Sequence, residues 1–414
     1  MSARAAFHAY ADSLLAPPSW RNAHWGVLIV DPASGDTLFS RNAGKLFMPA
    51  SNEKILTGAT ALAQLGPDFR FVTRFATDGT VHDGVLDGDL IVVGRGDPSF
   101  SDAMRGDWHL AFRDMADSLA AHGVHRIGGA IRRGGDAFPD DIYGYGWQMA
   151  DAEASYGAGV DELFVNEGFE RVVTRGPMGA GDSTVTEAVI KDPPAFFLDA
   201  LRDALAARGI ATGVVDARVP VDDRALHTIF TMQSPPLRAV LAAMLKPSQN
   251  QIAEILFKTL ALEKTGVGTA DSARRVVERQ LRAWGAERDG FAVRDGSGLS
   301  RHDYVTPETI VRVLRAMQLH RDFAAFYDGL PIAGVDGTIA SRMRGTPAER
   351  NVHAKTGTVD KARSLSGYVT TADGRVLLFS FLCNNFTVPT REVERVQDAL
   401  LARLAATRLV EGAR

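Results

Sequence analysis

Ser51 and Lys54 stand three residues apart in the segment Ser51-Asn-Glu-Lys54, at the start of a predicted helix that ends at Gly66-Pro67. Residues three apart lie on one face of a helix, so the lysine amine can reach the serine hydroxyl. A neutral lysine can accept the proton of a serine that attacks a carbonyl carbon. Free N–H groups at a helix start stabilise the oxyanion formed there. The alternative is a solvated lysine at an exposed helix start.

Ser248 and Asn250 form a second pair, ahead of a helix predicted over residues 252–263. In a non-helical turn both side chains can face one cleft. The hydroxyl would then pass a proton to a leaving amine, and the amide would hold a substrate carbonyl and the active lysine. A helix-capping turn is the alternative. A similar Ser40-Arg-Asn42 falls at the end of a predicted strand and is not favoured.

Lys355-Thr356-Gly357-Thr358 lies on or beside the edge of a predicted strand. The lysine can supply positive charge to a substrate carboxylate, and the threonine hydroxyl can bond to it. The glycine leaves room for a substrate that pairs with the strand. The backbone N–H of Thr358 can join that of Ser51 in an oxyanion hole.

A second Lys-Thr-Gly, at Lys264-Thr265-Gly266, directly follows the helix predicted over residues 252–263. We therefore interpret Gly266 as part of a helix C-terminal stop. The single cysteine, Cys383, lies in an apolar run that predicts a buried strand and an inert, packed thiol. The sequence has no His-Glu-x-x-His, no phosphate-binding glycine loop and no Gly-x-Ser-x-Gly, so the predicted chemistry needs no metal or organic cofactor.

The composition is that of a globular protein, with 414 residues of which 45% are apolar and 23% charged. A net charge of −4 argues against a nucleic-acid partner. No apolar run approaches the length of about 18 residues that a transmembrane helix needs. The first ten residues lack the apolar core of a signal peptide, so the protein is either cytoplasmic or has lost a signal before this numbering begins.

The periodicity of the chain changes after residue 70. Strands are predicted on either side of a turn at 31–36, whereas residues 71–95 alternate apolar and polar residues between Gly and Asp turns. We predict a β-rich accessory domain over 71–230, inserted into a discontinuous catalytic domain of residues 19–70 and 231–414. Helices are expected in the insertion at 107–123 and about 194–208.

The three motifs appear in the order and rough spacing of the penicillin-recognising serine enzymes. Four further segments narrow the match: 47–57, 94–99, 295–300 and 333–338. With them, the chain resembles the low-molecular-mass class C penicillin-binding proteins, the D-alanyl-D-alanine carboxypeptidase/endopeptidases of peptidase family S13. The resemblance covers most of the chain, from about residue 19 to residue 400.

The resemblance implies an α+β fold, with a serine β-lactamase/penicillin-binding-protein-like catalytic domain. Its antiparallel sheet has helices on both faces and a helical subdomain beside it, and a β-rich domain is inserted. The resemblance also implies roles for the motif residues. Ser51 would be acylated, Lys54 would accept its proton, Ser248 would relay protons and Asn250 would orient the substrate and Lys54. The terminal carboxylate would be bound by Lys355, Thr356 and Thr358, with Gly357 giving clearance.

The insertion departs from the family pattern, because residues 171–216 are short for two extra domains. Residues 176–182 are predicted to replace a longer β-rich piece, so a full third domain is not expected. Tyr145 and Trp147 are predicted to overhang the cleft and contact the peptide, although packing of the insertion against the catalytic domain is the alternative. Arg294, Asp295 and residues 297–299 are expected to line the cleft rim, and the alternative is that Asp295-Gly-Ser-Gly298 is only a turn.

The resemblance implies a serine-type D-Ala-D-Ala carboxypeptidase, with DD-endopeptidase action as a second activity. Its substrates would be peptidoglycan stem peptides ending in D-Ala-D-Ala, and β-lactams would acylate it. A β-lactamase or esterase with the same motifs is the nearest alternative, and a non-catalytic peptidoglycan-binding scaffold is another. Because peptidoglycan lies outside the cytoplasmic membrane, we expect an exported, periplasmic protein whose signal peptide is missing from this chain.

Overall fold

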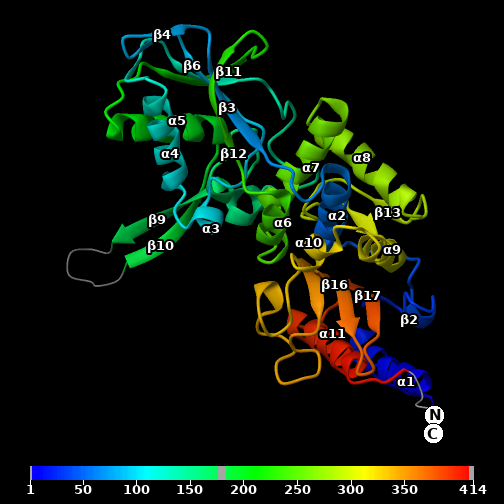
Figure 1. Cartoon of the computed structure of the whole chain (residues 1–414). Coiled ribbons are helices and arrows are strands. Elements are labelled where there is room, and N and C mark those ends of the chain that lie inside the picture. Colours follow the sequence, from blue (N-terminus) through cyan, green and yellow to red (C-terminus); the bar gives the residue numbers. More distant parts are fainter. Residues whose placement is uncertain (1, 176–182, 410–414) are drawn as a thin grey trace. The chain divides into compact units, whose positions relative to one another are not determined.

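Figure 1 shows a computed structural model of the chain, which describes residues 2–175 and 183–409. The chain divides into two compact units. The first comprises Met1–Pro67, Leu241–Phe257 and Arg274–Arg414, and the second comprises Asp68–Val240 and Lys258–Ala273. The units change between residues 67 and 68 and between residues 240 and 241, and residues 258–273 belong to the second unit. Independent folding of the two predicted domains stays a prediction.

The first unit is built on a five-stranded sheet in the order β15-β16-β17-β1-β2. All neighbouring strands are antiparallel. Their bounds are β1 His24–Val30, β2 Thr37–Arg41, β15 His353–Val359, β16 Ala362–Thr370 and β17 Val376–Asn384. Sequence-distant strands are thus neighbours: β1 pairs with β17 along its whole length. Strand β15 forms one edge of the sheet.

Helices cover both faces of this sheet. Helices α1 (Ala3–Leu15) and α11 (Thr390–Ala405) share one apolar core with alternate residues of β1, such as Val27 and Ile29. On the opposite face, a side chain at Gly26 would lie 2.9 Å from Pro307, the first residue of α9 (Pro307–Gln318). The alternation of a strand explains this division, because successive residues point to opposite faces.

The remaining helices of this region carry or support the motif residues. They are α2 (Glu53–Leu65), α6 (Leu237–Leu245), α7 (Asn250–Thr265), α8 (Ala270–Ala283) and α10 (Phe323–Tyr327), with a short ribbon of β13 (Phe291–Ala292) and β14 (Tyr304–Val305). The Cys383 thiol is buried in the core of the sheet, as predicted, and burial raises its pKa. A buried, protonated thiol is a poor nucleophile.

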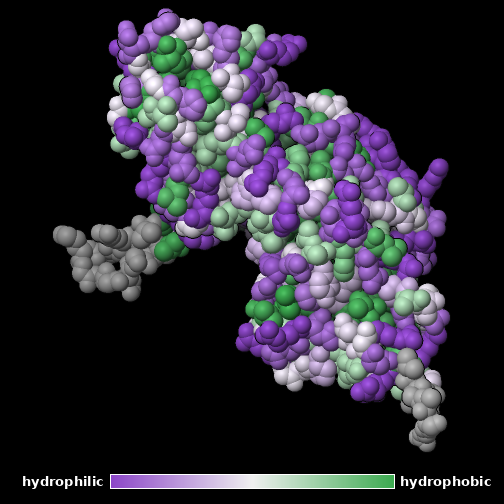
Figure 2. Space-filling model, in the orientation of Figure 1, coloured by the Kyte–Doolittle hydropathy of each residue, from purple (hydrophilic) through white to green (hydrophobic). Residues whose placement is uncertain are grey.

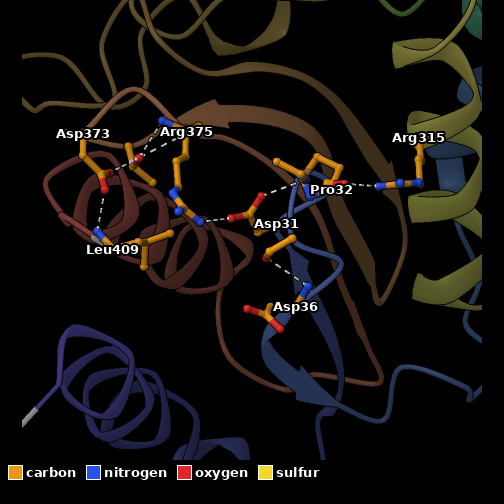
Figure 3. Close-up of polar contacts among 10 residues, drawn as sticks. Asp31, Pro32, Asp36, Arg315, Asp373, Arg375 and Leu409 are labelled. Atoms are coloured by element: carbon orange, nitrogen blue, oxygen red, sulfur yellow. Dashed lines mark hydrogen bonds and ion pairs between the residues drawn. The ribbon is translucent and has the colours of Figure 1, made fainter. Parts of the chain in front are cut away.

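Polar contacts hold the turns at one end of this sheet (Figure 3). In the turn between β1 and β2, the Asp31 carboxylate pairs with the Arg375 guanidinium, at 2.5 Å between Oδ2 and Nη1. The Arg315 side chain of α9 donates to the Pro32 carbonyl at 2.6 Å. Asp373 accepts from the Leu409 N–H at 2.9 Å. These contacts join four distant chain segments at this end of the sheet.

The second unit contains a mixed five-stranded sheet in the order β11-β8-β6-β3-β12. These strands are β3 (Val72–Thr77), β6 (Leu90–Val93), β8 (Ile131–Gly134), β11 (Val215–Val221) and β12 (His227–Gln233). The long helices α4 (His109–Ala121) and α5 (Pro193–Ala207) bury their apolar residues in one core with this sheet. Both helices were predicted from the sequence, with boundaries within two residues of these.

Shorter elements complete the second unit. They are β4 (Thr80–His82), β5 (Val85–Asp87), β7 (Arg126–Ile127), α3 (Asp102–Arg105) and the hairpin of β9 (Phe169–Arg175) and β10 (Ser183–Val189). The segment 176–182, predicted to replace a longer β-rich piece, lies outside the described residues. Within residues 2–175 and 183–409, no helix is long and apolar enough to cross a membrane. Figure 2 shows hydrophilic and hydrophobic residues intermixed on the face in view.

Candidate active site

Lys54 is fully buried in the first turn of α2, and its amine contacts three oxygen atoms. Nζ donates to Ser51 Oγ at 2.8 Å, to Asn250 Oδ1 at 2.6 Å and to the Ser297 carbonyl at 2.8 Å. Ser51 lies in the 3₁₀ turn Ala50–Asn52 that leads into α2. The structure therefore unites the first and second motifs, and it excludes the alternative of a solvated lysine.

The environment of Lys54 favours loss of its proton. Burial lowers the pKa of Lys54 to about 7, against the opposing charges of Asp295, Glu254 and Glu53. A buried ammonium loses its hydration, and neutral oxygen acceptors replace it only in part. The amine is thus poised between its two protonation states at neutral pH, as proton transfer from a hydroxyl requires.

Ser248 and Asn250 reach the same site from the start of α7, which begins two residues before its predicted start. Ser248 has φ +68°, a left-handed conformation that costs a non-glycine residue about 1 kcal/mol or more. Its hydroxyl accepts a hydrogen bond from Lys355 Nζ at 2.7 Å. This backbone turn brings both side chains of the motif to one side, Asn250 against Lys54 and Ser248 against Lys355.

Lys355 is a second fully buried lysine, on the edge strand β15. Besides Ser248, its amine donates to the Thr356 carbonyl at 2.9 Å. Burial lowers the pKa of Lys355 well below its usual value, and the nearby Lys54 and Arg363 lower it further. An anion bound beside this amine would oppose that shift, because an opposite charge favours the protonated form.

The outer edge of β15 offers backbone donors. At its start, Ala354 N–H donates to the Pro331 carbonyl, on the side away from β16. N–H groups of alternate residues in a strand point the same way, so those of Thr356 and Thr358 also face this outer edge. The Thr356 hydroxyl lies 2.7 Å from that of Thr338. The third motif therefore presents N–H and hydroxyl groups beside the Lys355 amine.

The backbone at Gly357 packs directly against the serine turn. A β-carbon on Gly357 would lie 2.9 Å from Ser51 N, 2.6 Å from the Pro49 carbonyl and 2.2 Å from Ser364 Oγ. Asn52 Nδ2 also donates to the Lys355 carbonyl, at 2.8 Å. Only glycine permits this close approach. It brings the backbones at Ser51 and Thr358 close together, as a shared oxyanion hole requires.

The segment 295–300 and Glu254 contribute contacts to this site, although only the first was considered from the sequence. Asp295 is buried, and its carboxylate accepts from the N–H groups of Gly298 at 2.6 Å and Ser300 at 2.7 Å. Glu254 Oε1 accepts from Ser297 N–H at 2.8 Å. The segment is a turn, and its Ser297 carbonyl contacts Lys54. Sequence reasoning missed Glu254. The signal that could have found this residue is its position one helical turn after Asn250.

Tyr145 and Trp147 both lie in the second unit, and their predicted contact with substrate stays a prediction. Tyr145 is 64% exposed. The Trp147 ring packs edge-to-face on Tyr143, with ring centroids 6.4 Å apart. Among the described residues, no group of three or more His, Cys, Asp or Glu side chains is placed to hold a metal ion.

Comparison with known protein families gives one match over most of the chain. The family model described as the D-Ala-D-Ala carboxypeptidase 3 (S13) family matches residues 8–188 and 170–407. The D-alanyl-D-alanine carboxypeptidase of Actinomadura sp. (strain R39) is 32% identical over 462 residues, which cover 95% of this chain and 83% of the relative. These matches confirm the predicted family and the prediction of a serine peptidase.

Solved structures match the whole fold. The crystal structure of penicillin-binding protein 4 (dacB) from Haemophilus influenzae has a TM-score of 0.84 at 22% identity, covering 95% of this chain and 99% of that chain. Its complex with a β-lactam has a TM-score of 0.76 at 23% identity, covering 94% and 97%. At these identities the matches establish the fold, and they confirm the predicted penicillin-binding-protein-like architecture.

Proposed function

Because this chain belongs to the D-Ala-D-Ala carboxypeptidase 3 (S13) family, we propose that it is a serine DD-carboxypeptidase that works through an acyl-enzyme on Ser51. One observation carries the assignment of the nucleophile. The buried Lys54 amine lies 2.8 Å from Ser51 Oγ, and burial brings its pKa to about 7. A neutral amine at hydrogen-bond distance from a hydroxyl is a competent proton acceptor.

In the first step, a peptide ending in D-Ala-D-Ala pairs with the outer edge of β15. Its terminal carboxylate is bound by Lys355, Thr356 and Thr358, and Gly357 leaves room for its backbone. Pairing to a strand edge supplies main-chain hydrogen bonds and fixes the position of the scissile bond. The carboxylate brings the negative charge that keeps the Lys355 amine protonated.

Acylation follows at the penultimate carbonyl. Ser51 Oγ attacks the carbonyl carbon while Lys54 Nζ takes the hydroxyl proton and Asn250 holds both Lys54 and the substrate amide. The oxyanion is stabilised by the N–H groups of Ser51 and Thr358. The C–N bond then breaks, and Ser248 delivers a proton to the departing D-alanine amine. In the second step, water attacks the Ser51 ester and releases the shortened peptide.

The proposed substrates are peptidoglycan stem peptides. As the second activity, DD-endopeptidase cleavage would hydrolyse the cross-links between these peptides. Tyr145 and Trp147 are the proposed contacts to the peptide side chain. β-Lactams are the proposed inhibitors, since their strained amide carbonyl would be attacked by Ser51 in the same way. Support comes from the related Haemophilus influenzae protein, whose structure has been solved in complex with a β-lactam.

The proposed place of action is outside the cytoplasmic membrane, in the periplasm, because peptidoglycan lies there. Cell fractionation of the natural source, followed by detection of the protein in periplasmic and cytosolic extracts, tests this. Recovery of the protein from the cytosol alone would contradict the proposal.

Intact-protein mass spectrometry after incubation with benzylpenicillin tests the acyl-enzyme. We expect one covalent adduct on the parent protein and none on Ser51→Ala. Ser40→Ala is the matched control, because Ser40 lies in β2 within the similar Ser-x-Asn pattern, and this variant should acylate normally. Penicillin destroyed without a stable adduct would favour a β-lactamase. Intact penicillin with no adduct would favour a non-catalytic scaffold.

A further inference from the structure

Two buried carboxylates hold the turn that presents the Ser297 carbonyl to Lys54. Glu254, on α7, accepts from Gly296 N–H at 3.1 Å and from Ser297 N–H at 2.8 Å. Asp295 accepts from Ser297 N–H at 3.1 Å and from Gly298 N–H at 2.6 Å. The Ser297 N–H is thus shared between the two carboxylates, while its carbonyl accepts from Lys54.

The turn is also packed too closely to shift freely. A β-carbon on Gly296 would lie 2.6 Å from the Ala253 carbonyl of α7. A β-carbon on Gly298, which has φ +79°, would lie 1.9 Å from the Ala50 carbonyl of the serine turn. On the side of α2, Thr57 Oγ1 donates to the Gly296 carbonyl at 2.8 Å. The turn is therefore fixed from both helices and from the turn that carries Ser51.

Several titratable groups face Lys54. The carboxyls are Glu53 on α2, Glu254 on α7 and Asp295 in the turn, with Asp303 beside Asp295, and the amine is Lys355 on β15. The two Glu53 oxygens have no hydrogen-bond partner among the described residues, and burial raises the pKa of Glu53 well above its usual value. Burial and the nearby Asp295 raise the pKa of Glu254 to about 8, while the N–H donors of Ser297 and Gly296 lower it in part.

We propose that Glu254 is a positioning residue for Lys54. By holding the N–H groups of Gly296 and Ser297, it fixes the Ser297 carbonyl that aims the Lys54 amine at Ser51 Oγ. The inference rests on the proposed role of Lys54 as proton acceptor. It adds a function for a glutamate that does not touch the reacting atoms.

The experiment measures the second-order rate constant for acylation by a fluorescent penicillin between pH 5 and pH 9, on the full chain. Glu254→Gln keeps the shape but loses an anionic acceptor for the two N–H groups. We expect the maximal rate to fall about ten- to hundredfold, the effect of losing a hydrogen bond to a charged group. We also expect the pH dependence of the rate between pH 7 and pH 9 to change, because this variant removes a carboxyl whose pKa burial raises to about 8.

Two variants separate titration from position. Glu254→Asp retains a titrating carboxyl, so its pH dependence between pH 7 and pH 9 should stay near that of the parent even where its maximal rate falls. Thr57→Val removes the bond to the Gly296 carbonyl and leaves the carboxyl in place, so the rate should fall while this pH dependence is kept. Thr57→Val also tests the proposal if Glu254→Gln does not fold. Glu162→Gln, in the second unit, is the matched control and should keep the parental rate. Glu162 is likewise a buried carboxyl, with its pKa raised to about 9.

A parental rate in Glu254→Gln, or a lower rate with the parental pH dependence between pH 7 and pH 9, would overturn the proposal. So would a parental rate in Thr57→Val. Failure of the proposed function has a different signature: the parent would then form no penicillin adduct, or Ser51→Ala would still form one.

Discussion

The chain contains two copies of Lys-Thr-Gly, and the structure gives them opposite environments. At 355–357 the lysine is fully buried on an edge strand and donates to Ser248 Oγ at 2.7 Å. At 264–266 the lysine is exposed in the last turn of α7. There, Gly266 has φ +78° and its N–H donates to the Leu262 carbonyl at 2.9 Å. This confirms the predicted helix stop.

The difference shows that the tripeptide has no chemistry of its own. In β15 successive side chains point to opposite faces, so Lys355 enters the site while the backbone stays open along the sheet edge. At a helix end the same residues face water and satisfy local backbone groups. What separates the copies is the Ser51 turn, which packs against Gly357.

The sharpest test replaces the lysine in each copy. Lys355→Ala should lower the rate of D-Ala-D-Ala hydrolysis by about a hundredfold, because removing one partner of a buried charged contact costs about 3 kcal/mol. Lys264→Ala should leave the rate unchanged, since this lysine is exposed. Steady-state release of D-alanine measures both. Equal losses in the two variants would remove the distinction between the copies.

The glycines should differ in the property that each one controls. Gly357→Ala should lower acylation by penicillin on the order of tenfold or more, because its β-carbon would meet Ser364 and the Pro49 carbonyl. Gly266→Ala should lower the free energy of unfolding by about 1–2 kcal/mol through its left-handed backbone, with acylation unchanged. Urea denaturation and adduct formation followed on both variants distinguish these effects. Normal acylation in Gly357→Ala would contradict the close approach.

The Lys-Thr-Gly copy at 355–357 should also lie in a site whose base, Lys54, titrates near neutral pH. Burial brings the pKa of Lys54 to about 7, and only its neutral form accepts the Ser51 proton. The acylation rate should therefore rise with pH through about 7 and fall about tenfold for each pH unit well below it. Stopped-flow acylation across pH 5–9 measures this, with circular dichroism to show that the fold persists. A rate that is flat below pH 7 would contradict a neutral-lysine base.

The smallest effect is expected at the threonines. Thr356→Val loses a hydroxyl that lies 2.7 Å from Thr338 Oγ1, and it should raise the KM for a D-Ala-D-Ala peptide about tenfold, the value of one buried hydrogen bond. Thr265→Val loses a bond to the Ala261 carbonyl at 2.9 Å and two longer contacts with the Val267 backbone, all at a helix end. Its free energy of unfolding should change by about 0.5 kcal/mol or less. A parental KM in Thr356→Val would assign carboxylate binding to other groups.

Most of the fold could be predicted from local patterns. The continuous apolar run of β1 reflects burial on both faces, and the periodic apolar residues of α4 and α5 reflect burial on one face; both are properties of consecutive residues. The three motifs were recognisable for a similar reason, since each consists of a few adjacent residues. The contacts of Glu254 could not be predicted in this way, because its partners Gly296 and Ser297 lie far along the chain.

By itself, the sequence determined which residue types were available and in what order, and through them the family. The tertiary structure alone decided which of the two Lys-Thr-Gly copies enters a site, and which carbonyl contacts Lys54. The physical reason is that the reactivity of Ser51 depends on the pKa of a lysine amine. That pKa is set by desolvation and by charges within a few ångströms, and residues from α2, α7 and the 295–300 turn come that close only after folding.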